Sequence, residues 1–169
     1  MIDHRGYFVE TYNAAALARH DIRVNFVQDN QSLSVKANTV RGLHFQTPPM
    51  SQTKLVRVLR GRIFDVAVDI RKGSPTYGRW CATTISADGG EQILIPRGFA
   101  HAYCTLESNT EVAYKVDNYY SEECSAGLLW NDPMIGITWP FGEEATLSDK
   151  DRKLPLLARF ESPFHASPA

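Results

Sequence analysis

The clearest pattern in this 169-residue chain is the alternation over residues 62–70, where every second side chain from Phe64 onward is apolar. The apolar side chains from Phe64 to Ile70 would share one face of a β-strand, and Asp65 and Asp69 would lie on the other. The alternation therefore predicts a strand with one buried face, and such a strand needs a second layer to cover it.

Similar short, strand-like segments recur along the chain and are separated by turn residues. Turn signals fall at 61, 72–75, 87–90, 96–98 and 107–110. They separate further predicted strands over residues 54–60, 79–86, 91–95, 102–106 and 111–117. Strands at this spacing are typical of an all-β sandwich or barrel in a single domain, residues 1–169.

Helical signals are few. Asn13 is placed to cap a short helix over residues 14–19, and Ser148 is placed to cap a helical turn at 149–151. Both helices would be peripheral to the barrel. Residues 160–169, which contain Pro163 and Pro168, are expected to form a loose tail.

Charge and cysteine content limit the class of protein. A net charge of −1 argues against a broad nucleic-acid-binding surface. The three cysteines (81, 104 and 124) form no CxxC pair, and no apolar stretch has membrane length. We therefore expect a cytoplasmic protein without disulfides and without a membrane or nucleic-acid partner.

Two histidines lie beside glycines near predicted strand ends. From Gly90 the spacing of glycine and proline up to His101 resembles the second motif of the cupins, which are jelly-roll barrels (double-stranded β-helices). Metal cupins carry a His-x-His pair in their first motif, but here the only candidate is His44-Phe45-Gln46. Because an amide is a poorer ligand than imidazole for transition metals, we expect no metal and no cofactor.

Without a metal, the chemistry would depend on acids and bases. His44 is the natural base, and Asp65, Asp69 and Asp151 are all candidates for its carboxylate partner. Tyr114 falls on an apolar strand face, where it is either a proton donor or a core tyrosine. Lys54 also shares a face with valines, where it either meets an anion or extends to solvent.

The chain resembles the dTDP-4-dehydrorhamnose 3,5-epimerases over nearly its whole length. The blocks that carry the resemblance are RGYFVE (5–10), FVQDN (26–30), RGLHFQ (41–46), QTKLVRV (52–58), FDVAVD (64–69), PRGFAH (96–101), YK (114–115), WNDP (130–133) and LSDKD (147–151). The resemblance implies cofactor-free epimerisation of a dTDP-4-keto-6-deoxyhexose at C3, C5 or both, as in dTDP-L-rhamnose-type deoxysugar biosynthesis.

The resemblance also implies roles for individual residues. His44 would remove a proton next to the ketone with Asp151 as its partner, Tyr114 would return a proton to the opposite face, and Lys54 would stabilise the enolate. The substrate-binding residues would be Arg5, Glu10, Gln28, Asn30, Arg41, His101, Tyr120 and Lys150. Members of the family are homodimers in which the N-terminal strand reaches the other subunit, so Arg5 and Glu10 would serve the partner's site.

Two departures from the family pattern affect these expectations. Ser125-Ala126 stands where the family commonly has Glu-Arg, and Met1 lies just ahead of the first block, where the family usually has one or two strands. The first leaves the sugar and the inverted carbons open, and the second leaves open whether the native chain is longer. A metal-dependent cupin enzyme and a non-catalytic sugar-nucleotide-binding cupin are the alternative functions.

Overall fold

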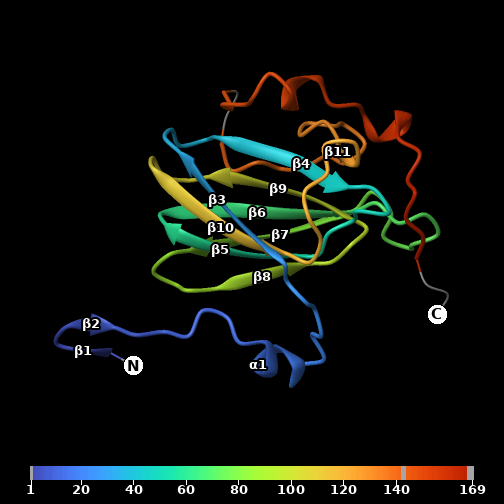
Figure 1. Cartoon of the computed structure of the whole chain (residues 1–169). Coiled ribbons are helices and arrows are strands. Elements are labelled where there is room, and N and C mark those ends of the chain that lie inside the picture. Colours follow the sequence, from blue (N-terminus) through green and yellow to red (C-terminus); the bar gives the residue numbers. More distant parts are fainter. Residues whose placement is uncertain (1, 142–143, 167–169) are drawn as a thin grey trace.

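The structure, a computed structural model, describes residues 2–141 and 144–166. Two antiparallel sheets face each other (Figure 1). One sheet has the order β3 (Gln28–Ser34), β10 (Thr110–Val116), β5 (Lys54–Arg60) and β8 (Gln92–Ile95). The other has the order β11 (Ser125–Gly127), β4 (Val40–Gln46), β9 (Phe99–Thr105), β6 (Arg62–Asp69) and β7 (Trp80–Ser86).

From β3 to β11, successive strands alternate between the sheets, apart from the β6–β7 hairpin. This is the connectivity of a jelly roll, and it confirms the predicted all-β, cupin-type barrel. Each strand predicted between residues 54 and 117 is present with ends shifted by at most one residue, except that β9 begins at Phe99, three residues before the predicted start.

Strand β6 corrects the prediction of a single buried face. Val66 and Val68 are fully buried, as expected, but they lie on the outside of the barrel beneath Leu128, Ile135, Leu157 and Phe164. The opposite face is also buried, with Ile63 and Ala67 in the core between the sheets and Asp65 only 2% exposed. The chain after β11 supplies this second cover, and Figure 1 shows it in orange and red over the five-stranded sheet.

The C-terminal segment is fixed by buried polar groups. Both carboxylate oxygens of Asp132 accept hydrogen bonds from backbone N–H groups, at Met134, Ile135 and Leu157. Ser162 donates to the carbonyl of Ile70, and Lys72 pairs with His165 in a β-bridge. The segment expected to be loose is therefore docked as far as residue 166, whereas 167–169 lie outside the described residues.

The helices are short and peripheral, as predicted. Helix α1 (Ala14–Ala18) begins after Asn13, whose side chain accepts from the N–H of Ala16. Ser148 accepts from the N–H of Asp151 as expected, but the turn it precedes is a 3-10 helix at Asp151–Lys153, two residues later than the predicted one. A second 3-10 helix covers Leu157–Arg159. No described helix is long and apolar enough to cross a bilayer.

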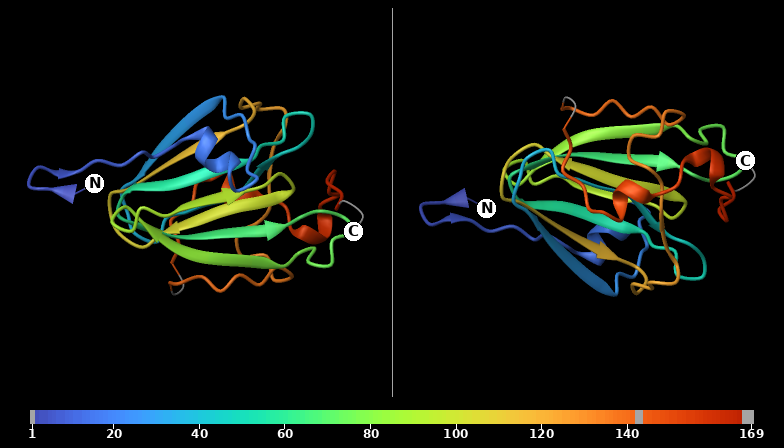
Figure 2. Two further views of the ribbon diagram at one scale, coloured as in Figure 1. Left: turned by 90° about the horizontal axis from the view of Figure 1, so that it is seen from below. Right: turned by 90° about the horizontal axis from the view of Figure 1, so that it is seen from above.

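An N-terminal arm projects beyond the barrel. It carries a small hairpin of β1 (Ile2–Asp3) and β2 (Gly6–Tyr7), which both views of Figure 2 place away from the two sheets. Tyr7 is 77% exposed and Val9 57% exposed on this arm. Such a run of exposed apolar side chains on an extended arm is typical of a segment that packs against another surface.

Candidate active site

A cavity of about 550 Å³ lies between the two sheets, and a bulge in β4 shapes its wall. Arg41 and His44 both line the cavity although they are three residues apart, a spacing that strict alternation would place on opposite faces. The register with β9 shifts between these two residues, which returns both to the same face. Gly42 in the bulge has a φ of +131°, and a Cβ there would lie 2.4 Å from the Cβ of Ala102.

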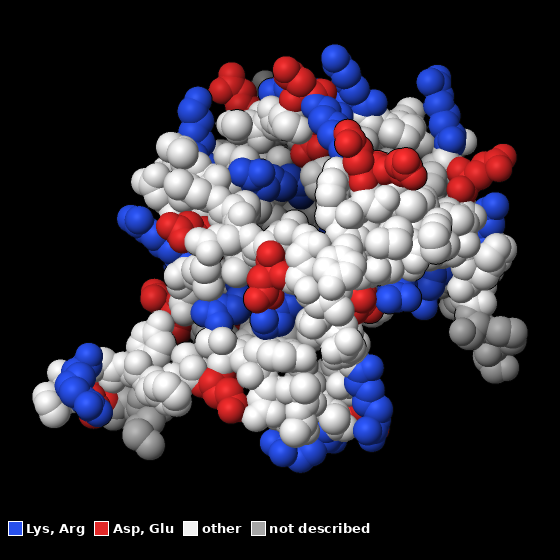
Figure 3. Space-filling model, in the orientation of Figure 1, with Lys and Arg blue, Asp and Glu red and all other residues white. Residues whose placement is uncertain are grey.

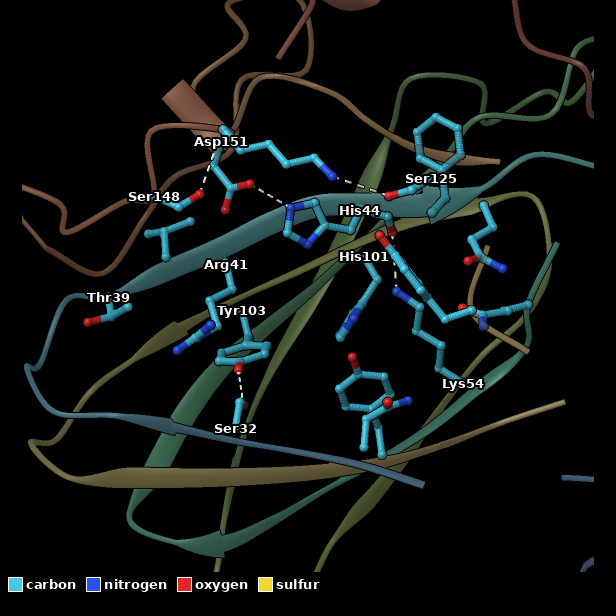
Figure 4. Close-up of a pocket in the computed structure, with 18 of the residues that line it drawn as sticks. Ser32, Thr39, Arg41, His44, Lys54, His101, Tyr103, Ser125, Ser148 and Asp151 are labelled. Carbon is cyan, nitrogen blue, oxygen red and sulfur yellow. Dashed lines mark hydrogen bonds and ion pairs between the residues drawn. The ribbon is translucent and has the colours of Figure 1, made fainter. Parts of the chain in front are cut away.

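His44 is paired with a carboxylate from the C-terminal segment. Its Nε2 lies 2.7 Å from Asp151 Oδ1 (Figure 4), so of the three candidate carboxylates the one beside His44 is Asp151, which the family resemblance also implies. Burial opposes ionisation of Asp151, but the hydrogen bond and charge of His44, with Gly42 N–H and the Ser148 hydroxyl, hold the pKa of this carboxyl below its usual value. An Nε2–H donated to Asp151 leaves Nδ1 of His44 as the basic nitrogen.

Lys54 enters the cavity from the opposite sheet. Its Nζ donates to the backbone carbonyl of His44 over 3.3 Å and lies 5.9 Å from the centre of the Tyr114 ring. Burial lowers the pKa of Lys54 from 10.5 to about 8, although the charge of Asp65 works in the other direction. The side chain is directed into the cavity, so the alternative of extension to solvent does not hold.

Tyr114 faces the cavity from β10, with Val112 and Val116 buried on the same face. Burial raises the pKa of Tyr114, and the charge of Arg41 opposes that rise only in part. The phenol therefore keeps its proton at neutral pH. The base at β4 and this phenol at β10 belong to opposite sheets, so a ring held between the sheets would have one group on each face.

The inward face of β3 forms a polar wall along the cavity. Gln28, Asn30 and Ser32 line the cavity, and Ser34, next in the alternation, accepts a hydrogen bond from Arg41 Nε. At the other end of the strand the Gln28 side chain accepts from the N–H of Tyr120, whose side chain is 59% exposed. This polar face explains why apolar alternation does not reveal β3 in the sequence.

Basic side chains outnumber acids in the cavity. Arg41, Lys54 and Lys150 line it together with Asp151. Lys150 Nζ reaches the hydroxyl of Ser125 at 3.4 Å, and Figure 3 shows basic side chains set into a hollow on this face of the molecule. This balance suits a ligand with a negatively charged group such as a diphosphate.

His101 forms a second imidazole–carboxylate pair. Its Nε2 lies 2.9 Å from Asp65 Oδ2 in the core between the sheets, where both side chains are almost fully buried. Asp69, the third candidate carboxylate, instead binds Arg71, Ser74 and Thr76 outside the site.

The cupin-like positions do not form a cluster of metal ligands. The Gln46 amide bonds backbone groups, donating to the carbonyls of Met50 and Tyr119 and accepting from the N–H of Ser121. Within residues 2–141 and 144–166, no three His, Cys, Asp or Glu side chains lie close enough together to hold a metal ion. Gln46 therefore orders the loop that carries Tyr120.

The structure brings ten of the twelve sequence-predicted site residues to this cavity: Gln28, Asn30, Arg41, His44, Lys54, His101, Tyr114, Tyr120, Lys150 and Asp151. Arg5 and Glu10 are absent from its lining, and Arg5 instead pairs with Asp3 in the arm hairpin. The cavity also contains residues that the sequence reasoning missed, among them Ser32 and Tyr103. Strand periodicity could have found Tyr103, which lies two positions beyond His101, whereas Ser32 lies on β3, which alternation does not reveal.

Comparison with known proteins gives concordant results. Residues 1–159 match the family model described as dTDP-4-dehydrorhamnose 3,5-epimerase. The dTDP-4-dehydrorhamnose 3,5-epimerase of Salmonella typhimurium is 51% identical over 156 residues, which is 92% of this chain and 85% of that protein.

Two solved structures are also similar. The dTDP-4-dehydrorhamnose 3,5-epimerase of Bacillus anthracis, solved with TDP and PPi bound, has a TM-score of 0.89 and 52% identity, with 91% of this chain and 87% of that one covered. An epimerase of Legionella pneumophila in complex with dTDP-4-keto-L-rhamnose has a TM-score of 0.92 and 41% identity, covering 98% and 89%.

Proposed function

Because the chain belongs to the dTDP-4-dehydrorhamnose 3,5-epimerase family, we propose which of its residues carry out the epimerisation and how they divide the work. The enzyme is an isomerase that epimerises a dTDP-4-keto-6-deoxyhexose in dTDP-L-rhamnose-type deoxysugar biosynthesis. Both C3 and C5 are inverted, by analogy with relatives named as 3,5-epimerases. Its expected location is the cytoplasm.

One observation carries the assignment of roles: the paired histidine and the protonated phenol lie on opposite walls of one cavity. His44 with Asp151 approaches from β4, and Tyr114 approaches from β10. Inversion of a carbon requires removal of a proton from one face of the ring and its return to the other, which this arrangement provides for a hexose held between the sheets.

Each inversion then proceeds in two proton transfers. The C4 ketone acidifies the neighbouring C–H, and Nδ1 of His44 takes that proton while the electron pair moves onto the ketone oxygen. The Lys54 ammonium stabilises the enolate oxygen, and Asp151 stabilises the imidazolium. Tyr114 protonates the carbon from the other face, and exchange with solvent returns His44 and Tyr114 to their starting states without a metal or cofactor.

The rest of the cavity binds the nucleotide. Arg41 and Lys150 neutralise the diphosphate, the amides of Gln28 and Asn30 suit a pyrimidine edge, and exposed Tyr120 stacks on the base. His101, held by Asp65, adds a further contact from the five-stranded sheet. Ser125 places a neutral hydroxyl beside Lys150, so no carboxylate at this position competes with the ligand for the Lys150 ammonium.

A homodimer completes the site in this proposal. Arg5 and Glu10 lie on the projecting arm rather than in their own chain's cavity, and the arm exposes Tyr7 and Val9. In a dimer the arm would bury these side chains against the second subunit and bring Arg5 and Glu10 to that subunit's nucleotide.

The function is tested by incubation with dTDP-4-keto-6-deoxyglucose in heavy water, followed by NMR. We expect deuterium at C3 and C5, no change after treatment with a chelator, and at least about a 1,000-fold lower rate in His44→Ala, which keeps its affinity for dTDP. Protein that exchanges neither carbon would contradict the function. Near-full activity of His44→Ala would contradict the assignment of the base alone.

A further inference from the structure

Tyr103 is a buried phenol in the cavity wall that the proposed mechanism does not use. It lies two residues after His101 on β9, and the centres of the two rings are 6.3 Å apart. Its cross-strand neighbours are Arg41 on β4 and Asp65 on β6. Since directly paired residues of antiparallel strands point to the same side, all three side chains face the barrel interior.

The hydroxyl of Tyr103 is held by the opposite sheet. Its oxygen lies 2.8 Å from the hydroxyl of Ser32 on β3, as Figure 4 shows, and Ser32 also lies 3.5 Å from the carbonyl of Val112. When Ser32 donates to that carbonyl, Tyr103 donates to Ser32 and its own oxygen can accept from a ligand. When Ser32 donates to Tyr103, the phenol proton can be donated instead.

Burial above all keeps Tyr103 a neutral hydrogen-bonding group. Burial raises the pKa of Tyr103, and neighbouring Tyr114 and Asp65 raise it further, while the Ser32 hydrogen bond and the charge of Arg41 oppose this only in part. Its ring stands next to His101, and Tyr103, Ser32 and Tyr114 line the same cavity. The hydroxyl pair therefore borders the space that the proposed function gives to the hexose.

We propose that Tyr103, positioned by Ser32, is a substrate-binding residue that hydrogen-bonds a hydroxyl of the hexose ring and so contributes to sugar specificity. The inference rests on the proposed function, because it assumes that the hexose lies between His44 and Tyr114. Arg41, Lys150 and Tyr120 supply the nucleotide contacts. Removing the Tyr103 hydroxyl is thus expected to affect the sugar and to spare the nucleotide.

The experiment compares Tyr103→Phe with wild type and with Tyr77→Phe, a matched control in the outer pocket formed with Trp80 and Met134. We measure kcat/KM for dTDP-4-keto-6-deoxyglucose and the Kd of dTDP alone. Loss of one neutral hydrogen bond predicts a roughly 5- to 20-fold lower kcat/KM for Tyr103→Phe, with the Kd of dTDP within about twofold of wild type. Tyr77→Phe should match wild type in both.

Ser32→Ala tests the positioning step, and it keeps the inference falsifiable if Tyr103→Phe does not fold. We expect a loss in kcat/KM of about threefold for Ser32→Ala, and no further loss when it is added to Tyr103→Phe, because both variants remove one interaction. Unchanged kcat/KM in the two single variants, or a Kd of dTDP that rises in parallel, would overturn the inference. Wild-type protein without turnover would overturn the proposed function as well, so the two failures are distinguishable.

Discussion

At the scale of single residues, Lys54 shows how function and stability oppose each other. The folded protein holds this ammonium group where burial lowers its pKa to about 8, whereas the unfolded chain hydrates it with a pKa near 10.5. Between these values the unfolded chain binds more protons, so stability rises as the pH increases through this window. Below it, the cost of the buried cation is fully present.

Lys54→Met is therefore expected to stabilise the protein at neutral pH. The pKa difference corresponds to a cost of about 3 kcal/mol for the buried cation. Asp65 loses a favourable charge in the variant, which offsets part of this gain, so we expect the free energy of unfolding to rise by about 1–3 kcal/mol. Turnover should fall about 100-fold or more because the enolate loses its cation. Urea unfolding and NMR turnover measurements test both effects.

The pKa of Lys54 also predicts a loss of activity on the alkaline side of the pH profile. Wild-type kcat/KM should decline above pH about 8 as Lys54 of the free enzyme loses its proton. Lys54→Arg, which stays charged, should shift this decline to higher pH in whatever activity it retains. An unchanged alkaline limb in Lys54→Arg would assign the decline to another group.

Tyr114 gives a second residue-scale prediction. Tyr114→Phe removes the proposed acid and leaves His44, Asp151 and Lys54 in place, so proton removal at C3 and C5 should persist while inversion slows. We expect epimerisation to fall at least about tenfold more than deuterium exchange into recovered substrate. Equal losses of both rates would show that the two proton transfers are not divided in this way.

At the scale of elements, the bulge in β4 decides which side chains meet in the cavity. Without the register shift, Arg41 and His44 would point to opposite faces. The bulge brings the backbone of Gly42 against Ala102 and within 3.4 Å of Asp151 Oδ2. The block RGLHFQ resembles its family counterpart, yet only the pairing of β4 with β9 shows why glycine stands beside the base.

Gly42→Ala should be strongly destabilising. The new Cβ would meet Ala102 at 2.4 Å in a backbone conformation that favours glycine, so the expected loss is about 3 kcal/mol or more. Gly73→Ala is the matched control, because Gly73 has a φ of +78° and an added Cβ would meet no atom within 4 Å; it should lose only about 1 kcal/mol. Equal losses in urea unfolding would mean that backbone conformation, not collision, dominates.

At the scale of the whole molecule, the projecting arm is the feature that a single chain leaves unexplained. Its hairpin lies away from the two sheets, and Arg5 and Glu10, the proposed nucleotide contacts on the arm, lie outside the cavity of their own chain. A dimer that exchanges arms would explain both features, because each arm would then complete the other subunit's site.

Mixing two impaired variants tests this exchange. Arg5→Ala and His44→Ala should each be impaired alone, Arg5→Ala chiefly in affinity for dTDP. If each arm serves its partner, a mixed dimer contains one site with neither substitution. Since about half of the dimers are mixed after subunit exchange, about a quarter of the wild-type sites should be recovered. Light scattering checks the dimer, and failure of the mixture to recover activity would contradict the exchange.

The sequence by itself determined the barrel and most of the site's membership. Alternation fixes which faces of β5, β6 and β10 are apolar. The family blocks carry nine of the ten predicted residues that the structure gathers in one cavity, and Tyr120 is the tenth. Alternation could not show that the Asp65 face of β6 is also buried, because the cover comes from β5, β8 and β10 on one side and from the segment after β11 on the other. Nor could it reveal β3, whose inward face is polar.

Only the tertiary structure shows the pairs themselves. The residue pattern leaves Asp65, Asp69 and Asp151 equivalent, and only the family resemblance names Asp151; in the structure they pair with His101, Arg71 and His44 respectively. Asp151 reaches His44 from 107 positions away in the chain. Such pairs depend on how the C-terminal segment crosses the barrel, and no local periodicity encodes that path. The same holds for Tyr103 and Ser32, which face each other only because the two sheets close into a barrel.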